Sequence, residues 1–296
     1  MPAAVTVVVA TRDRREQLAT TLPRHAPAPV ILVDNGSTDG TLDLVAEHFP
    51  QVSVLALGSN LGAPARNLGV AAAATPYVAF ADDDSWWAPG ALARAAELLD
   101  RHPRLGLVAG RVLVGREERL DPISAWMAEA PIGAEPDLPG PSVLGFLACA
   151  AVVRREAFLA CGGFDDVVFF LGEEERLALD LAAAGWGLAY CDDVVAHHHP
   201  DLSSSRDMGG RAVQQARNRV LTAVLRRPWP VVWAAVRAGA QDVGLRRLLA
   251  ALLPGPLVRA LLRRRRLPAV VEVTRRRLDA EPVRTGVTRQ DEPEAS

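Results

Sequence analysis

Three consecutive carboxylates, Asp82, Asp83 and Asp84, directly follow the apolar run Tyr77-Val-Ala-Phe-Ala81. Carboxylates crowded in this way repel one another unless a cation or an arginine neutralises them. A divalent cation suits the position, because Mg²⁺ uses one or two carboxylates together with substrate phosphates, and Mn²⁺ accepts similar oxygen ligands. The alternative is an exposed acidic turn that caps the next helix. The place of the triplet after a buried strand favours the metal site.

Two further segments carry residues that can contact a nucleotide. In Val30-Ile-Leu-Val-Asp-Asn-Gly-Ser-Thr-Asp-Gly-Thr41, Asp34 ends a predicted strand, where a carboxylate can accept hydrogen bonds from a base or ribose. The competing interpretation is an ordinary strand-to-helix turn built on Asn-Gly and Ser/Thr caps. In Asn60-Leu-Gly-Ala-Pro-Ala-Arg-Asn67, Arg66 lies at a predicted helix start. Taken singly, it is equally consistent with a surface arginine.

Three glutamates, Glu173, Glu174 and Glu175, open a predicted amphipathic helix over residues 173–184 that closes at Gly185. A positioned carboxylate of this kind can act as a general base. Helix periodicity places Glu174 on an apolar face, so we expect it to face inward more than Glu173, and the periodicity does not exclude Glu175. The alternative is that all three complement the helix dipole, which is worth about 0.3–1 kcal/mol each.

The elements that must position these residues follow a βαβα order. Apolar runs typical of strands occur at residues 5–10, 30–33, 52–57 and 77–81, separated by stretches long enough for helices. This order predicts parallel, mostly buried strands. Ligands of such sheets gather outside the carboxyl ends of the strands, where Thr11 and Arg12 join Asp34 and the aspartate triplet.

The second half of the chain is less regular. Residues 123–141 contain Pro, Gly and Trp without clear periodicity and predict loops, whereas residues 144–153 predict an apolar strand. A further strand is expected around residues 188–191, and the triplet His197 to His199 follows it. Beyond residue 210 the pattern is helical and rich in arginine.

Composition predicts a folded chain with an uneven distribution of charge. Of 296 residues, 49% are hydrophobic and 23% charged, which permits a large core without disulfide or metal support. The net charge is -2, yet the 17 arginines from Arg206 to Arg277 face only three acidic residues, a local charge of +14. Three widely spaced cysteines favour a cytoplasmic location, and the apolar stretch 5–10 is too short for a signal or membrane span.

Together, the opening Val7-Val-Val-Ala-Thr-Arg12, the VDNGSTDGT segment, NLGAPARN and the aspartate triplet closely resemble family 2 glycosyltransferases of the GT-A fold. The resemblance covers roughly residues 5–199. It implies an α/β fold with a mostly parallel central sheet flanked by helices. It also implies an inverting transfer of a sugar from a nucleotide diphosphate, UDP or dTDP more than GDP, to a hydroxyl of a glycan, a lipid-linked acceptor or a small molecule.

The same resemblance assigns roles on the donor side. Thr11 and Arg12 belong to the donor-binding segment Val7 to Arg12, and Asp34 and Arg66 would hold the base of the nucleotide. The aspartate triplet resembles the DxD metal motif of the family. The ligands it implies for Mn²⁺ or Mg²⁺ are Asp84, Asp82 and His197, with Asp82 and Asp83 also serving the ribose.

On the acceptor side, Gly162-Gly-Phe-Asp165 resembles the acceptor segment of the family and gives Gly163, Phe164 and Asp165 as acceptor-binding residues. Glu174 stands where the family usually has an aspartate base. This is a departure, because glutamate is one methylene longer and must be set back to reach the same proton. Glu173 and Glu175 therefore stay as rivals for the role.

These assignments divide the chain into a catalytic domain at 1–205, an arginine-rich helical region at 206–278 and a disordered tail at 279–296. Within the catalytic domain, about 1–110 is the nucleotide-sugar half and about 111–205 the acceptor half. The helical region predicts either amphipathic helices on the anionic inner face of a membrane or an appendage packed on the catalytic domain or a partner subunit, including a second copy. The membrane interpretation uses Trp229, Trp233, Leu248, Leu249, Leu252 and Arg263 to Arg266.

Three other functions compete with glycosyl transfer. A sugar-phosphate nucleotidyltransferase would need an early glycine-rich loop, and Thr11-Arg-Asp-Arg14 contains no glycine. A non-catalytic nucleotide-sugar-binding or scaffold protein would keep Asp34 and the triplet while the glutamates stay idle. Nucleic-acid binding rests on charge alone, because no recognised motif supports it, and we do not expect it.

Overall fold

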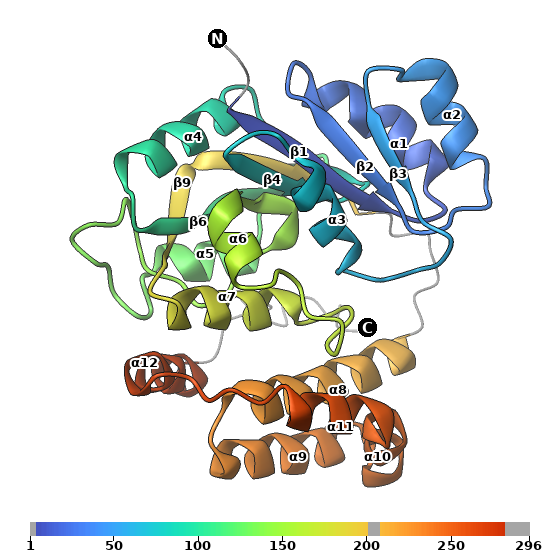
Figure 1. Cartoon of the computed structure of the whole chain (residues 1–296). Helices are drawn as coiled ribbons and strands as arrows, with labels where there is room; N and C mark the ends of the chain where they lie inside the picture. Colours follow the sequence, from blue (N-terminus) through green and yellow to red (C-terminus); the bar gives the residue numbers. More distant parts are fainter. Residues whose placement is uncertain (1–3, 201–207, 282–296) are drawn as a thin grey trace, which may run out of the picture.

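The computed structural model describes residues 4–200 and 208–281. One mixed sheet with helices on both faces forms the larger part, and the helices that follow residue 208 lie beneath it (Figure 1). The strands of this described part run in the order β3-β2-β1-β4-β8-β6-β9-β5, with β7 paired to β6.

The first four predicted strands are confirmed. They are β1 (Val5–Thr11), β2 (Val30–Asp34), β3 (Ser53–Ala56) and β4 (Tyr77–Ala81), and they pair in parallel. The expectation that they are buried holds for β1, β2 and β4. It fails for β3, which lies at the edge of the sheet and keeps three of its four residues exposed.

The other half of the sheet contains antiparallel pairs. β8 (Ala151–Arg154) runs antiparallel to both β4 and β6 (Leu105–Val114), and β7 (Arg119–Leu120) is antiparallel to β6. β9 (Gly187–His198) is parallel to β6, and β5 (Ser85–Trp87) closes the sheet antiparallel to β9. Through the pairing of Ser85 with His198, the end of β9 lies beside the residues that follow β4.

Two predictions for the middle of the chain are wrong. The strand expected at 144–153 forms only over β8, because a 3-10 turn, η2 (Ala148–Ala150), precedes it. The loops expected from residue 123 begin with helix α5 (Pro122–Ala128). Asp121 starts this helix, since its carboxylate accepts a hydrogen bond from the backbone nitrogen of Ile123 at 2.7 Å.

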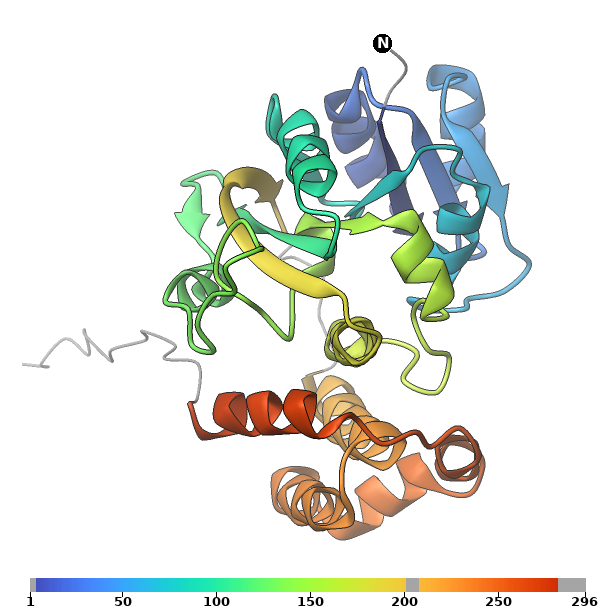
Figure 2. The same cartoon turned by 60° about the vertical axis from the view of Figure 1, so that its left-hand side comes forward.

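Helices cover the two faces of the sheet as separate layers (Figures 1 and 2). One layer consists of α1 (Arg15–Thr21), η1 (Leu22–His25), α2 (Thr41–His48) and α4 (Ala91–Arg101). The other consists of α3 (Ala65–Ala72), α5, α6 (Arg155–Ala160) and α7 (Glu173–Ala183). α3 approaches β1 so closely that a Cβ on Gly69 would lie 2.5 Å from a methyl of Val8.

The predicted arginine-rich region is helical and packs on α7 and the loop before it (Figure 2). It consists of α8 (Met208–Arg226), α9 (Trp229–Val243), α10 (Leu245–Leu252), α11 (Gly255–Leu262) and α12 (Ala269–Ala280). Val167 and Val168, from the part that contains the sheet, share the apolar core of these helices.

Several arginines of this region pair with carboxylates of the part that contains the sheet. Arg226 contacts Asp180 of α7, and Arg275 contacts Glu175 with an N–O separation of 2.9 Å. The local positive charge is therefore compensated in part by docking onto α7, which favours the packed-appendage interpretation.

Two predictions need correction: the set of side chains expected to face a membrane, and the start of the disordered tail. Leu248 and Leu252 are fully buried in the core of the helical region, so they cannot line an exposed apolar face. Asp279 belongs to α12, where its carboxylate accepts a hydrogen bond from Arg227 at 2.7 Å. The remainder of the predicted tail, residues 282–296, lies outside the described residues.

Candidate functional site

The candidate site lies at the carboxyl ends of β1, β2 and β4. Their register pairs Thr11 with Asp34 and Val9 with Ala81, so the residues that follow each strand meet at one edge of the sheet. The edge predicted from the strand order is therefore the edge at which the donor-side residues gather.

Asp83 contacts side chains at the end of β1 and just after it. Its Oδ2 accepts a hydrogen bond from the Thr11 hydroxyl at 3.3 Å, and its Oδ1 lies 3.9 Å from Nε of Arg14. Burial and the adjacent charges of Asp84 and Asp82 raise the pKa of Asp83 to about 7, against the opposing effect of Arg14 and Thr11. A cation bound at the triplet would relieve this repulsion.

Asp82 forms an ion pair with Arg66 at the start of α3. Arg66 is only 6% exposed, so the interpretation of it as a surface arginine is wrong. Burial opposes its charge, but the carboxylates of Asp82, Glu173 and Glu174 outweigh that effect and raise the pKa of Arg66. Arg66 thus lies between the aspartate triplet and the glutamates of α7.

Asp84 is paired with His198, whose Nε2 lies 3.3 Å from its Oδ1. Burial opposes the charge of His198, but the contact with Asp84 outweighs it and raises the pKa of the imidazole. The sequence favoured His197 for this place. His197 instead stacks on Trp86 and lies 3.2 Å from Glu118, because β9 extends through both histidines and successive side chains of a strand point to opposite faces.

The pair of Asp84 and His198 fits a divalent cation that also binds a diphosphate. Within residues 4–200 and 208–281, no group of three or more His, Cys, Asp and Glu side chains is arranged to enclose a metal. Mg²⁺ characteristically takes one or two protein carboxylates, and phosphate oxygens and water complete its shell. A site with few protein ligands at this edge is compatible with that chemistry.

Asp34 is buried at the end of β2 and accepts hydrogen bonds from the backbone nitrogen and the hydroxyl of Ser37. The next residue, Asn35, is also buried, and its Oδ1 accepts a hydrogen bond from the backbone nitrogen of Leu61 at 3.0 Å. Asn35 therefore joins the end of β2 to the loop before α3, a role that the sequence analysis did not assign. Arg12, in contrast, is largely exposed beside Asp13.

The three glutamates have different surroundings. Glu173 is 2% exposed, and its Oε2 has no hydrogen-bond partner among the described residues, so the expectation that Glu174 is the more inward residue is wrong. Burial, reinforced by Glu173, raises the pKa of Glu174, which is half-buried. Glu175 is held by Arg275 of α12. Glu174 thus combines accessibility with an environment that favours proton binding.

The predicted acceptor segment has a structural role in this conformation. The Asn67 side chain donates to the carbonyl of Phe164 and accepts from its backbone nitrogen, both at 2.9 Å. The Phe164 ring is buried between Phe80 and Phe158, so it cannot touch an acceptor. Asp165 is likewise engaged, with its Oδ2 3.2 Å from Nη2 of Arg176. Gly163 adjoins this segment with a φ of +67°.

Solved structures share this fold. The chain aligns with the mannosyltransferase PcManGT from Pyrobaculum calidifontis, solved in complex with GDP-Man and Mn²⁺, at a TM-score of 0.56 and 22% identity over 94% of this chain and 88% of that one. It aligns with TarS from S. aureus at a TM-score of 0.55 and 18% identity, over 92% and 91% of the two chains. The chain therefore has the GT-A glycosyltransferase fold.

Sequence comparison gives the family. Residues 6–162 match the profile described as Glycosyl transferase family 2, and the chain belongs to this family. It is 30% identical over 234 residues to the N-acetylglucosaminyl-diphospho-decaprenol L-rhamnosyltransferase of Mycobacterium tuberculosis. This alignment covers 63% of this chain and 71% of the relative. It is 32% identical over 207 residues to the pre-mycofactocin glycosyltransferase of the same organism, over 66% of this chain and 43% of that protein. The protein is therefore an enzyme of glycosyl transfer, and the nucleotidyltransferase and scaffold alternatives are set aside.

Proposed function

We propose that the protein is an inverting, metal-dependent glycosyltransferase in which Glu174 takes the proton of the acceptor hydroxyl. The observation that carries this proposal is the position of Arg66, which pairs with Asp82 and lies close enough to Glu173 and Glu174 for their charges to raise its pKa. The donor edge and the candidate base therefore belong to one electrostatic cluster.

Asp84 and His198 would hold Mn²⁺ or Mg²⁺, and Asp82 and Asp83 would contact the ribose. A bound divalent cation supplies Lewis-acid stabilisation of the charge that develops on the departing diphosphate. Asp34, at the buried end of β2, would bind the base. PcManGT in complex with GDP-Man and Mn²⁺ supports a cation in this fold, and the relative named as an L-rhamnosyltransferase supports a deoxyhexose donor.

Glu174 suits the role of general base for two reasons. Its raised pKa makes its carboxylate a stronger proton acceptor than an ordinary glutamate, and such a base contributes about 10²–10⁴ in rate. Glu175 is committed to Arg275, and Glu173 is almost fully enclosed. Attack of the acceptor from the side of Glu174, opposite the leaving diphosphate, would invert the anomeric carbon.

Replacement of Glu174 by glutamine tests this role. We expect Glu174→Gln to reduce kcat by at least about 10²-fold, whereas the matched variant Glu175→Gln, which loses only the contact with Arg275, stays within a few-fold of the wild type. NMR of the product should show the anomeric configuration opposite to that of the donor. Unchanged turnover of Glu174→Gln, or retention of configuration, would refute the assignment.

The acceptor is proposed to be lipid-linked, on the basis of the diphospho-decaprenol named for the rhamnosyltransferase relative.

No helix within residues 4–200 and 208–281 is long and apolar enough to cross a membrane. Peripheral contact through the helical region has support from exposed apolar side chains, including Trp233 at 64% and Leu262 at 82%. Flotation with anionic vesicles should weaken in the double variant Trp233→Ser, Leu262→Ser, and equal flotation would reject the contact.

A further inference from the structure

Two loops at the donor edge are joined by hydrogen bonds between residues distant in the sequence. The first loop follows β1 and contains Asp13, and the second follows β2 and contains Ser37 and Thr38. The backbone nitrogen of Asp13 donates to the Ser37 hydroxyl at 2.9 Å, and the backbone nitrogen of Thr38 donates to Oδ1 of Asp13 at 2.7 Å. Asp13 therefore holds the second loop with both its backbone and its side chain.

The backbone of Asp13 has a conformation that is uncommon for a residue with a side chain. Its φ is +53°, in the left-handed region. A non-glycine residue persists there only where the surrounding contacts fix it. The bonds to the second loop provide that restraint, and the backbone nitrogen of Arg15, which donates to Oδ2 of Asp39 at 3.0 Å, joins the same two loops. The two loops are thus held together as one unit.

The direction of the Ser37 hydroxyl follows from its two partners. A backbone N–H can only donate, so the hydroxyl oxygen must accept the bond from Asp13. Its single proton is then left for the carboxylate of Asp34, to which the hydroxyl donates. The backbone nitrogen of Ser37 donates to the same carboxylate, 3.0 Å from Oδ2. Asp34 is therefore held as an acceptor by both donors of Ser37.

This arrangement restricts the kind of base that can bind at Asp34. An ionised carboxylate has about four acceptor positions and no donor, so the positions that Ser37 leaves can take only an N–H or O–H group. Uracil and thymine have a ring N–H at N3, whereas N3 of cytosine carries no proton and only accepts. Cytosine in the same orientation would set one acceptor against another beside a buried carboxylate.

We propose that Ser37 is a positioning residue that, held by Asp13, fixes Asp34 as an acceptor and so selects a base with a ring N–H over cytosine. The inference rests on the proposed function, in which Asp34 binds the base, and adds the residue that sets its selectivity. Because the bonds to Ser37 exist before the nucleotide arrives, little free energy is lost in ordering the carboxylate on binding.

The test measures calorimetric binding of UDP and CDP, which differ only in the base, to the full chain with Mn²⁺. We expect the wild type to bind UDP at least about tenfold tighter than CDP, because only uracil can donate from N3 to Asp34. Ser37→Ala should weaken UDP binding about tenfold and change CDP binding little. Ser37→Thr, which keeps the hydroxyl, should recover the preference. Equal affinity of the wild type for both nucleotides, or an unchanged preference in Ser37→Ala, would overturn the proposal.

Two further variants separate the role of Ser37 from the proposed function. Asp34→Asn introduces a group that can also donate, so it should abolish the preference for UDP. If Asp34→Asn keeps the preference, the proposed base-binding role of Asp34 fails too, and if only Ser37→Ala keeps it, the role of Ser37 alone fails. Thr38→Val is the matched control in the same loop and should behave as the wild type, because it loses only the hydroxyl contact with Asp13 at 3.3 Å and keeps the backbone bond.

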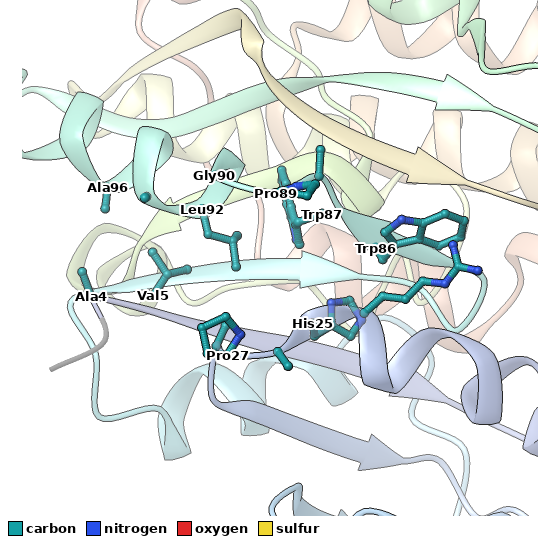
Figure 3. Close-up of a pocket in the computed structure, with 15 residues that line it drawn as sticks. Ala4, Val5, His25, Pro27, Trp86, Trp87, Pro89, Gly90, Leu92 and Ala96 are labelled. Atoms are coloured by element: carbon teal, nitrogen blue, oxygen red, sulfur yellow. The ribbon is translucent and has the colours of Figure 1, made fainter. Parts of the chain in front are cut away.

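A cavity on the other side of the sheet provides a second control. It has a volume of about 750 Å³ and lies between η1 and α4, and its lining includes neither Asp34 nor Ser37 (Figure 3). Ala93→Phe, on the exposed face of α4 at the wall of this cavity, should therefore leave the affinity for UDP unchanged. Loss of UDP binding in this variant would place the nucleotide in the cavity and overturn the role of Ser37.

Discussion

Arg66, which is buried, forms an ion pair with the partly exposed Asp82 at the end of the sheet edge that faces α7. Arg66 comes from the start of α3 and Asp82 from the end of β4, and the charges of Glu173 and Glu174 also act on this guanidinium. A single arginine therefore interacts with carboxylates on the proposed donor side and on the proposed acceptor side of the site. Its loss should affect the protonation of the base as well as the binding of the donor.

The first prediction concerns this arginine. Arg66→Met removes the cation from a cluster of three carboxylates, so the pKa of Glu174 should rise further and the acid limb of the kcat/KM profile should move to higher pH. Because Asp82 is partly exposed, the loss of stability should be smaller than the about 3–5 kcal/mol that breaking a fully buried pair costs. Arg66→Lys, which keeps the charge, should recover part of both effects. A pH profile identical to that of the wild type would contradict the electrostatic role.

A second prediction follows from the raised carboxyl pKa values. A carboxyl whose pKa is raised by folding binds more protons in the native than in the unfolded protein, so it destabilises the native state as pH rises through the interval between the two values. For Asp83 this interval runs from about 4 to about 7. Asp83→Asn and Glu174→Gln should therefore stabilise the native state at pH 8, by on the order of 1 kcal/mol for each pKa unit, and much less at pH 4. The gain should appear as a higher Tm at pH 8. Equal Tm shifts at pH 8 and at pH 4 would refute this electrostatic destabilisation of the native state.

The neighbouring histidines provide a third prediction with an internal control. His198→Ala removes the partner of Asp84, whereas His197→Ala removes the residue stacked on Trp86. We expect His198→Ala to raise the Mn²⁺ concentration needed for half-maximal activity by at least about tenfold, and His197→Ala to change it little. The reverse ranking would restore His197 as the metal-site residue.

The helical region holds the loop that precedes α7, the helix that carries Glu174. The Asn218 amide donates to the carbonyls of Phe170 and Leu171, the latter at 2.7 Å, and Phe169 and Leu171 both have positive φ. Non-glycine residues in this conformation cost free energy and persist only when their surroundings fix them.

Asn218→Leu should therefore release this loop and lower kcat more than it raises the KM for the donor. The expected loss in kcat is about tenfold, because misplacement of a base by even 1 Å is costly. Far-UV circular dichroism would verify the fold, and Gln215→Leu, at an exposed position on the same helix, serves as a control. Loss confined to the KM for the donor would argue against positioning of Glu174.

The sequence was sufficient to predict the donor edge, because β1, β2 and β4 are continuous apolar runs and polar residues follow each of them directly. It did not predict β6, whose run is interrupted by Gly106 and Gly110. These glycines mark close contacts instead of turns: a Cβ on Gly110 would lie 2.5 Å from the carbonyl oxygen of Val194. Such contacts are made by residues distant in the chain.

The same limit applies to the site. Local helix periodicity could not show that Glu173 is the more buried glutamate, because Arg66 and the sheet edge, which enclose it, come from other elements. The choice between His197 and His198 depends on the irregularity in the pairing of β6 with β9 between Cys191 and Val195, which sets the face that each histidine occupies. The burial of Glu173 and the orientation of His198 both depend on tertiary contacts, which a local sequence pattern does not contain.

The most direct test of the account is calorimetric binding of UDP and dTDP, with and without Mn²⁺, to the wild type and to Asp84→Asn. The account predicts that Mn²⁺ tightens binding of at least one diphosphate by about tenfold or more in the wild type, and that this gain disappears in Asp84→Asn. Diphosphate affinity that is the same in Mn²⁺ and in excess chelator, and unaffected by the substitution, would contradict the central claim that this triplet acts through a bound cation.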